Sequence, residues 1–393
     1  MKKVVIVGGG FSGIETAIRL RNLNSGVEII LINEDDCFSF VPSLYETAAG
    51  ELSEGDVCLL ISRLISRRNI IYYHDKVEKI NLRKRFVSTK NLECIEFDYL
   101  VLAVGAETNY YGIGGAEKFL MNLKTKDDAQ RIYEKVNNIL ESRKKHDFAV
   151  CGGGLTGIEF AGTLADHIHE SSRKLKHGKS DFNVCIVQGA HTILPGLPDK
   201  AIRFATNYLK KRGVKIYLDS CIVKVGKNTI YTKDRKRIHY DTAVWAGGIK
   251  THRIIAENKI RHSDMGGERA LPGGGMLVND YLQLVNDEHV FGAGDCICPI
   301  NPKITPIKTA QNAVDMAKVL SYNIDALLRG KKMKKYLPIN NMFYISVGKN
   351  MGMYVFGNTV RIGKEIKAKK DILELSYVDN LRKGKLLENN IYC

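Results

Sequence analysis

The sequence has no long apolar run, no low-complexity segment and no leader-like start. None of its 393 residues fall in an apolar stretch of the roughly 18 residues that a bilayer-crossing helix requires. The charged pair Lys2–Lys3 runs directly into a β-branched segment, so we expect no signal peptide. We expect a globular chain of two domains and an appendage.

The nine cysteines form no recognisable set of pairs. They are odd in number and scattered along the chain, which is typical of reduced thiols in a cytosolic protein rather than of a disulfide framework. No cysteine stands five residues after Cys37, so the C-x-x-x-x-C pair of flavin disulfide reductases is absent.

Acidic residues are too few to balance the basic ones. The chain has 59 Lys and Arg against 43 Asp and Glu, a formal charge of +16, and residues 331–386 hold 13 basic and 4 acidic side chains. Such a cluster can serve nucleic acid, an anionic membrane face or only solubility. No nucleic-acid-binding motif accompanies it, so we expect no nucleic acid partner.

The N-terminus carries the first motif. Residues 2–15 read KKVVIVGGGFSGIE, a β-branched run followed by Gly8, Gly10 and Gly13 and then by helix formers. This is the strand, turn and helix of a dinucleotide-binding fingerprint. The first glycine permits the turn, the second admits a pyrophosphate and the third lets the helix pack on the strand, so the phosphates sit at the helix N-terminus.

Fingerprints of this kind place an acid at the end of the next strand, where it binds a ribose hydroxyl. Here Val27–Asn33 reads as that strand, and it ends with Asn33 beside Glu34. We expect these two residues at the ribose, although both can equally be ordinary loop residues.

A second fingerprint begins 144 residues later. A strand over Phe148–Cys151 leads into Gly152, Gly154 and Gly157, and residues 158–165 open a helix. Two complete units predict two dinucleotide sites in one chain. The following strand, residues 183–187, ends at Gln188.

Gln188 is neutral where an acid would bind the ribose 2′-hydroxyl and repel a 2′-phosphate. We therefore expect relaxed discrimination, with NADPH at least tolerated. The alternative is that the Gln188 amide binds the hydroxyl by itself and NADH is still preferred.

Several segments resemble type II NADH:quinone oxidoreductases. They are FVPSLYE at 40–46 with AAG at 48–50, and TNYYG at 108–112 with LKT at 123–125. The resemblance implies that Pro42 and its neighbours contact a flavin. The alternative is a loop and helix whose apolar residues simply pack.

Three further segments resemble parts of FAD-dependent relatives. Residues 97–107 contain a buried strand that is expected to end at Gly105, and they resemble the segment that closes an FAD domain. Residues 241–250, which include Gly247, resemble its counterpart in the second domain. In HVFGAGD, residues 289–295, the resemblance implies that Gly294 and Asp295 hold the ribityl or pyrophosphate of FAD.

Residues 309–319 open a helix whose N-terminus would stabilise negative charge on a reduced flavin. Ala310 and Gln311 resemble the start of the family's A-Q-x-A-x-Q quinone-site motif, in which Asp315 here replaces the second Gln. The resemblance also suggests a place for Lys349 near the flavin. Glu159 is expected near the junction of nicotinamide and flavin, or else only complements the dipole of its helix.

The last residues predict strands over 336–362 and a basic amphipathic helix. Asp371 and Glu374 form its expected start, Leu373, Tyr377 and Leu381 its apolar stripe, and Gly384 its stop. Such a helix can lie on an anionic membrane, here at the cytoplasmic face of the cell membrane, or pack on the parent domain or a second subunit as a homodimer.

The expected fold is α/β, with two Rossmann-like domains and a small C-terminal α+β region. We expect an FAD domain at 1–115 and 280–335, an NAD(P)H domain at 116–279 and a C-terminal region at 336–393. The resemblance implies hydride transfer from NAD(P)H to non-covalent FAD and then two electrons to a quinone, with no metal.

Two alternatives stay open. A sulfide:quinone oxidoreductase needs redox-active cysteines beside the flavin, but no cysteine occurs between Cys298 and Cys393. A flavin-binding protein with a decayed NAD(P)H site would account for Gln188 and Asp315.

Overall fold

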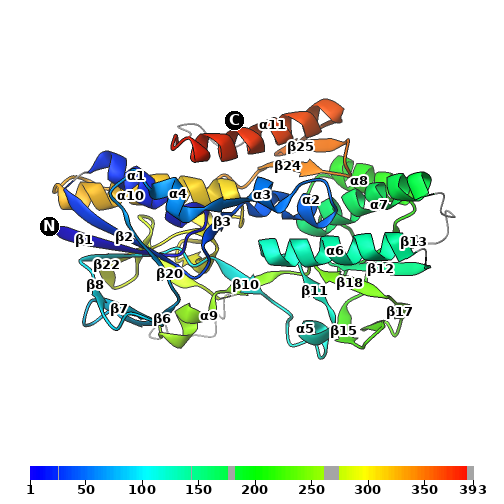
Figure 1. Cartoon of the computed structure of the whole chain (residues 1–393), viewed down its shortest axis with the longest axis horizontal. Coiled ribbons are helices and arrows are strands. Elements are labelled where there is room, and N and C mark those ends of the chain that lie inside the picture. Colours follow the sequence, from blue (N-terminus) through cyan, green and yellow to red (C-terminus); the bar gives the residue numbers. More distant parts are fainter. Residues whose placement is uncertain (25, 143, 176–181, 261–273, 387–393) are drawn as a thin grey trace.

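The computed structural model describes residues 1–24, 26–142, 144–175, 182–260 and 274–386 (Figure 1). The sequence over 262–276 is rich in glycine and lacks periodicity, which predicts a loop, and the larger part of it lies outside the described residues. Figure 1 shows two α/β units at opposite ends of the long axis, with the C-terminal elements above them.

The first unit is built on an eight-stranded sheet in the order β23-β20-β21-β22-β9-β1-β2-β5. Its strands are β1 Lys2–Val7, β2 Val27–Asn33, β5 Ile71–His74, β9 Tyr99–Leu102, β20 Met276–Val278, β21 Gln283–Leu284, β22 Asp287–Gly292 and β23 Ile297–Pro299. β1 lies between β2 and β9 and is parallel to both. The residues from Val4 to Val7 are all buried, which explains why this strand reads as a continuous apolar run.

Two long helices pack together in this unit. α1 spans Phe11–Leu23 and follows the first glycine turn, and α10 spans Ala310–Leu328. Figure 1 shows them side by side, and Ser12 of α1 donates a hydrogen bond from its hydroxyl to the Ala313 carbonyl of α10 at 2.9 Å. The N-termini of both helices are thereby brought to the same region.

The second unit is built on a five-stranded sheet in the order β11-β18-β12-β13-β14, and every neighbouring pair is parallel. Its strands are β11 Met121–Asn122, β12 His146–Cys151, β13 Phe182–Val187, β14 Lys215–Tyr217 and β18 Thr242–Trp245; its helices are α6 Lys126–Ser142, α7 Leu155–Leu175 and α8 Asp199–Lys211. The expected α/β class with two Rossmann-like units is confirmed.

A two-stranded antiparallel ribbon connects the two units. It pairs β10 (Ala106–Thr108) with β19 (Ile249–Thr251), where the chain leaves the first sheet and returns to it. The remaining small sheets are β3 Cys37–Ser39 with β4 Cys58–Leu60, β6 Val77–Asn81 with β7 Phe86–Thr89 and β8 Ile95–Glu96, and β15 Ile222–Val225 with β16 Thr229–Thr232 and β17 Arg237–His239. The short helices are η1 Val41–Ser43, α2 Leu44–Ala48, α3 Glu54–Val57, α4 Ile61–Ile65, α5 Ala116–Phe119, α9 Arg253–Glu257, η2 Gly294–Cys296 and η3 Pro302–Ile304.

The C-terminal region is a three-stranded sheet followed by one helix. The strands are β24 Met342–Ser346, β25 Gly352–Phe356 and β26 Thr359–Gly363, and helix α11 spans Lys364–Arg382. The predicted start of this helix at Asp371 is wrong, because α11 begins seven residues earlier, directly after Gly363. Residues 364–370 contain no glycine or proline, so nothing interrupts the helix there.

α11 packs on the first unit through the apolar stripe. Tyr377 and Leu381 are buried, whereas Leu373 is only half-buried. The Tyr377 ring lies 5.6 Å from that of Phe11, and its hydroxyl donates to the Glu15 carboxylate at 3.0 Å. Among the described residues, no helix combines the length and apolar composition needed to span a bilayer.

Candidate functional site

The first glycine turn has the geometry that a dinucleotide phosphate requires. Gly8 has a φ of 109°, and a side chain there would collide with the Ala103 carbonyl. A Cβ on Gly13 would collide with the Gly8 carbonyl, so this glycine lets α1 pack closely on the turn. By contrast, a Cβ on Gly10 would meet no atom of the described residues within 4 Å. The space above Gly10, at the N-terminus of α1, is therefore open for an anion.

The second glycine turn repeats this geometry. Gly152 has a φ of 120° and abuts the Ala246 carbonyl, and Gly157 abuts the carbonyl of Gly152. A Cβ on Gly154 would again meet no protein atom within 4 Å. The chain thus has two helix N-termini with open space beside them, one at the carboxyl ends of the parallel strands of each sheet.

Asn33 and Gln188 occupy equivalent positions beside the two turns. The Asn33 side-chain oxygen accepts a hydrogen bond from the Gly9 N–H at 2.6 Å, and that of Gln188 accepts from the Gly153 N–H at 2.9 Å. Each amide group therefore holds its glycine turn while remaining uncharged. Glu34 is oriented differently, since its carboxylate pairs with Lys76 at 2.6 Å on the surface.

In each sheet, a glycine also lies two or three residues after the end of the strand that adjoins the glycine turn. Gly105 follows β9 with a φ of 69°, and no atom lies within 4 Å of the place of a Cβ. Gly247 follows β18, and a side chain there would press on the Trp245 ring at 2.5 Å. Pro42 lies in η1, before α2, and is half-buried.

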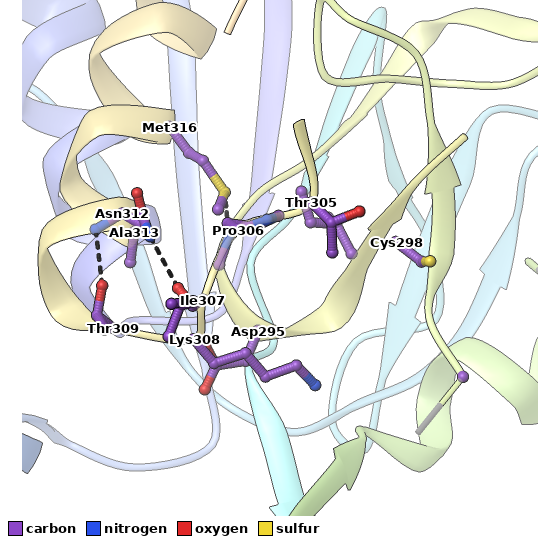
Figure 2. A pocket seen from close by; sticks show the side chains of 13 residues that line it. Asp295, Cys298, Thr305, Pro306, Ile307, Lys308, Thr309, Asn312, Ala313 and Met316 are labelled. Atoms are coloured by element: carbon purple, nitrogen blue, oxygen red, sulfur yellow. Dashed lines mark hydrogen bonds between the residues drawn. The ribbon is translucent and has the colours of Figure 1, made fainter. Parts of the chain in front are cut away.

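A cavity lies where η2 meets the N-terminus of α10 (Figure 2). Asp295 and Lys308 line it, together with Thr309, whose hydroxyl caps α10 by accepting from the Asn312 N–H at 3.2 Å. Gly294 has a φ of 81° and donates its N–H to the Met316 sulfur at 3.1 Å. The structure thus brings the Gly294–Asp295 turn to a capped helix N-terminus, which Ala310 opens.

Asp295 lies near a cation, and Gln311 makes a hydrogen bond within its own helix. Lys124 lies 3.9 Å from the Asp295 carboxylate, whose side chain is 24% exposed. Gln311 is buried and donates from its amide to Asp315 at 2.7 Å. Asp315 therefore binds the glutamine of its own helix rather than standing as an isolated charge.

Glu159 lies in a buried cluster of charges, between α7, β24, α2 and α11. Its Oε1 accepts from the Ser346 N–H at 3.0 Å and lies 3.8 Å from the Lys370 ammonium. Burial raises the pKa of Glu159 to about 7, although Lys370 and the Ser346 N–H act to lower it. A carboxyl group with this pKa exchanges a proton near neutrality.

Lys370 is the centre of the cluster. Its ammonium lies 3.0 Å from Glu374 Oε1 and 3.2 Å from the Tyr45 hydroxyl, and that hydroxyl donates to Ser346 at 2.8 Å. Lys370 is 2% and Glu374 4% exposed, so both charges are removed from water. Burial raises the pKa of Tyr45 well above its usual value, which keeps the phenol neutral.

A second buried pair lies alongside. Lys367 donates to Glu46 at 3.0 Å, and both side chains are 9% exposed. Burial acts to raise the pKa of Glu46, but Lys370 and Lys367 outweigh it and lower this pKa overall. Neither lysine stands out in the sequence, because the buried Lys367 and Lys370 alternate with exposed lysines in the same run. Their i, i+3 spacing was the only available signal.

Lys349 lies where three parts of the chain meet. Its ammonium is 2.6 Å from both Glu51 and Glu170, and its N–H donates to Asp166 at 3.0 Å. Glu51 follows α2, Glu170 lies in α7 and Lys349 follows β24. The side chain is 12% exposed and is held by these ion pairs.

The sequence is similar to that of known proteins along most of its length. The family model for pyridine nucleotide-disulphide oxidoreductases matches residues 2–317. A type II NADH:quinone oxidoreductase of Staphylococcus saprophyticus is 26% identical over 97% of this chain and 96% of its own length, and that of Staphylococcus aureus is 26% identical over 95% and 94%.

Two solved structures share the fold. NDH2 from Plasmodium falciparum in complex with NADH superimposes with a TM-score of 0.86 at 18% identity, over 98% of this chain and 96% of that one. The sulfide:quinone oxidoreductase of Aquifex aeolicus gives 0.83 at 19% identity, over 98% and 92%. With the family model spanning both glycine turns and the Gly294–Asp295 turn, the chain belongs to the pyridine nucleotide-disulphide oxidoreductase family.

Proposed function

We propose that this chain is an FAD-dependent NAD(P)H:quinone oxidoreductase. The observation that carries the proposal is the pair of glycine turns, each with open space above its second glycine, Gly10 or Gly154. Two such sites in one chain suit a donor nucleotide and a resident flavin nucleotide. The full-length match to type II NADH:quinone oxidoreductases supports the choice of donor and acceptor.

The first site has the features that FAD needs. Gly10 leaves room for the pyrophosphate at the N-terminus of α1, and Asn33 lies at the ribose position. Gly105, Asp295 and the capped start of α10 extend the same edge of the sheet, which supports the assignment of residues 1–115 and 280–335 to the FAD domain. Bound there, FAD would supply the chemistry of accepting a hydride and passing on two electrons.

The second site fits NAD(P)H for the same reasons. Gly154 leaves room for its pyrophosphate, and Gln188 offers an uncharged amide at the adenine ribose, so neither nucleotide is repelled. This supports residues 116–279 as the NAD(P)H domain. Gly247, after β18, lies on the side of the sheet that the nicotinamide half would reach.

Glu159 is the group that we assign to proton transfer. Reduction of a quinone by a hydride equivalent consumes one further proton, and Glu159 holds a proton near neutrality at the junction of α7 with α2. Gln311, at the start of α10, would orient the acceptor through its amide. The ion pairs of Lys349 with Glu51 and Glu170 support a role in holding the three parts of the chain together. In this role, Lys349 would affect the flavin site only indirectly.

The C-terminal region supports a peripheral membrane contact. Ile372 and Leu375 of α11 are 65% and 58% exposed and Phe356 is 50% exposed, while basic residues are concentrated in this part of the chain. Apolar side chains among cations suit an anionic lipid surface at the cytoplasmic face of the membrane. Sedimentation with anionic vesicles tests this contact. The protein should be released by about 0.5 M salt, because salt at this concentration screens exposed charges. A homodimer through the same face stays a prediction.

Anaerobic stopped-flow tests the function as a whole. The FAD-loaded protein is mixed with NADH, NADPH or sulfide, and flavin bleaching is followed before a quinone is added. We expect bleaching by both nucleotides and rapid recovery with quinone. Bleaching by sulfide alone would favour the function of the Aquifex aeolicus neighbour, and no bleaching by millimolar nucleotide would indicate a decayed second site.

A further inference from the structure

A strained turn lies between the two units. The Ile113 N–H donates to the Tyr110 carbonyl at 2.9 Å, and the two residues between them, Tyr111 and Gly112, have φ values of 51° and 70°. Positive φ at both central positions is the pattern of a type I′ turn, for which Asn-Gly is the preferred pair. A bulky aromatic residue in this conformation is an outlier, and such outliers persist where the surroundings or the function demand them.

The side chain of Tyr111 reaches the second glycine site. A Cβ built on Gly248 would collide with the Tyr111 hydroxyl oxygen, so the phenol rests directly on that glycine. Gly248 follows β18, and the sheet order β11-β18-β12-β13-β14 changes direction between β12 and β18. A dinucleotide bound at the carboxyl edge of such a sheet crosses this point, with one half on each side. Since Gln188 marks the adenine side, Gly248 borders the nicotinamide side.

The residues before Tyr111 are held by ring packing and hydrogen bonds, whereas Tyr111 itself is exposed. The Tyr110 ring packs 5.6 Å from that of Trp245, its hydroxyl donates to Asn122 at 2.7 Å, and the Trp245 indole N–H donates to the Asn109 carbonyl at 3.0 Å. Tyr111 itself is 64% exposed and lines a surface hollow. The backbone is thus anchored, while most of the Tyr111 side chain stays exposed beside Gly248.

The hollow has the chemistry of a nucleotide contact. Two lysines, Lys118 and Lys250, and one acid, Glu117, line it together with Tyr111, so the hollow offers an aromatic ring and an excess of positive charge. At the corresponding position of the first unit, after β9, a Cβ built on Gly105 would have no atom within 4 Å in the part of the chain that the structure describes. Among the residues that the structure describes, the second site alone therefore carries an aromatic side chain over this glycine.

We propose that Tyr111 is a positioning residue for the nicotinamide half of NAD(P)H, and that the turn keeps its strained tyrosine for this contact. This inference rests on the proposed function. The phenol ring packs against the nicotinamide nucleoside bound over Gly248 and fixes its approach to the flavin. The adenine half, bound at Gln188, does not depend on Tyr111.

The test separates strain from binding by placing the preferred turn residue at this position. In Tyr111→Asn, the turn gains an Asn-Gly pair, so the melting temperature of the FAD-loaded protein should rise by a few degrees. The Kd for NAD⁺, measured by calorimetry, should increase about tenfold as an aromatic contact is lost, while the Kd for AMP changes less than about twofold because AMP lacks the nicotinamide half. Tyr111→Phe keeps the ring and should keep the NAD⁺ affinity.

Arg235→Asn is the matched control. Arg235 also has a positive φ, 65°, and is exposed. It closes a turn in which its N–H donates to the Thr232 carbonyl at 3.0 Å. This substitution should raise the melting temperature without changing either Kd. An unchanged Kd for NAD⁺ in Tyr111→Asn, or an equal loss of NAD⁺ and AMP binding, would overturn the inference. Failure of NADH and NADPH to bleach the flavin of the unaltered protein would instead refute the proposed function.

Discussion

The ammonium of Lys370 lies 3.8 Å from the carboxylate of Glu159 and joins the C-terminal helix to the first turns of α7. The same ammonium contacts Glu374 at 3.0 Å, so one lysine faces two buried carboxylates. One cation cannot neutralise both, and the second carboxylate is stabilised by holding a proton. Burial is the main cause of the raised pKa of Glu159, about 7, and the charge of Glu374 adds to it, at the group to which we assign the proton uptake of the proposed reaction.

The pH dependence of stability should report this proton. Burial raises the pKa of Glu159 from 4.5 to about 7, so between these pH values the folded chain keeps a proton that the unfolded chain has lost. Folding stability contributed by this group is therefore present below pH 4.5 and is lost as the pH rises to about 7. The melting temperature of the native protein relative to Glu159→Gln should be higher at pH 5 than at pH 8. The exposed Glu141→Gln variant should show no such difference, and equal behaviour of both variants would contradict the assignment.

The activity should follow the same group. Above pH 7 or so, Glu159 loses its proton, and reoxidation of the reduced flavin by quinone should slow in the native protein. Glu159→Gln should reoxidise more slowly at every pH and lose this pH dependence, whereas flavin reduction by NADH should change less. Stopped-flow traces of the two half-reactions from pH 5 to 9 measure this, and a full loss of NADH reduction would place the role of Glu159 elsewhere.

Removal of the Lys370 charge should destabilise the fold strongly. Lys370→Met leaves Glu374 and Glu159 buried without their cation, a change that typically costs about 3–5 kcal/mol. Lys370→Met combined with Glu374→Gln should recover part of this loss, because one uncompensated charge is gone. Lys369→Met is the control, since Lys369 is exposed and lies 5.8 Å from the Tyr344 ring. A double-mutant cycle from thermal melts gives the coupling, and additive effects would show that the pair does not interact.

Sequence reasoning was strongest where local chemistry decides the structure. The roles of Gly8, Gly10 and Gly13 depend on a turn, an open face and a close helix, all set within a few residues. Their geometry was therefore predictable, and that of Gly152, Gly154 and Gly157 followed by repetition.

The buried charges were not predictable, because burial of a lysine is decided by tertiary packing. Lys364, Lys367, Lys369 and Lys370 look alike in sequence, but only Lys367 and Lys370 face α2 and α7. The start of α11 before Asp371 was missed for the same reason, since tertiary packing also decides which residues of this run are buried. Asp371 and Glu374 have the spacing of a helix start, yet in the structure they are i+4 partners of Lys367 and Lys370 inside the helix.

Equivalent substitutions in the two glycine turns should have different effects. Gly10 has an extended φ of −78°, and neither Gly10 nor Gly154 has a protein atom near its Cβ place, so the fold tolerates a side chain at both. Gly10→Asp should purify without flavin, because a carboxylate then repels the FAD pyrophosphate. Gly154→Asp should keep its flavin absorbance but resist reduction by NADH. Gly10→Ala and Gly154→Ala serve as uncharged controls, and a colourless Gly154→Asp protein would reverse the assignment of the two sites.

The last prediction concerns the choice of nucleotide, which depends on the amide at the end of β13. Gln188 holds the Gly153 N–H through its side-chain oxygen, and a glutamate can make the same bond. Gln188→Glu should therefore keep the glycine turn and NADH binding while its charge repels the 2′-phosphate of NADPH. In the native protein, we expect kcat/KM for NADH and for NADPH to differ less than about a hundredfold. In the variant, repulsion between the new carboxylate and the 2′-phosphate should lower kcat/KM for NADPH by about tenfold or more, which corresponds to about 1.4 kcal/mol. Gln188→Ala removes the bond to Gly153 without adding charge and should weaken both nucleotides alike. A native preference for NADH above a hundredfold would mean that the Gln188 amide selects the ribose hydroxyl by hydrogen bonding alone.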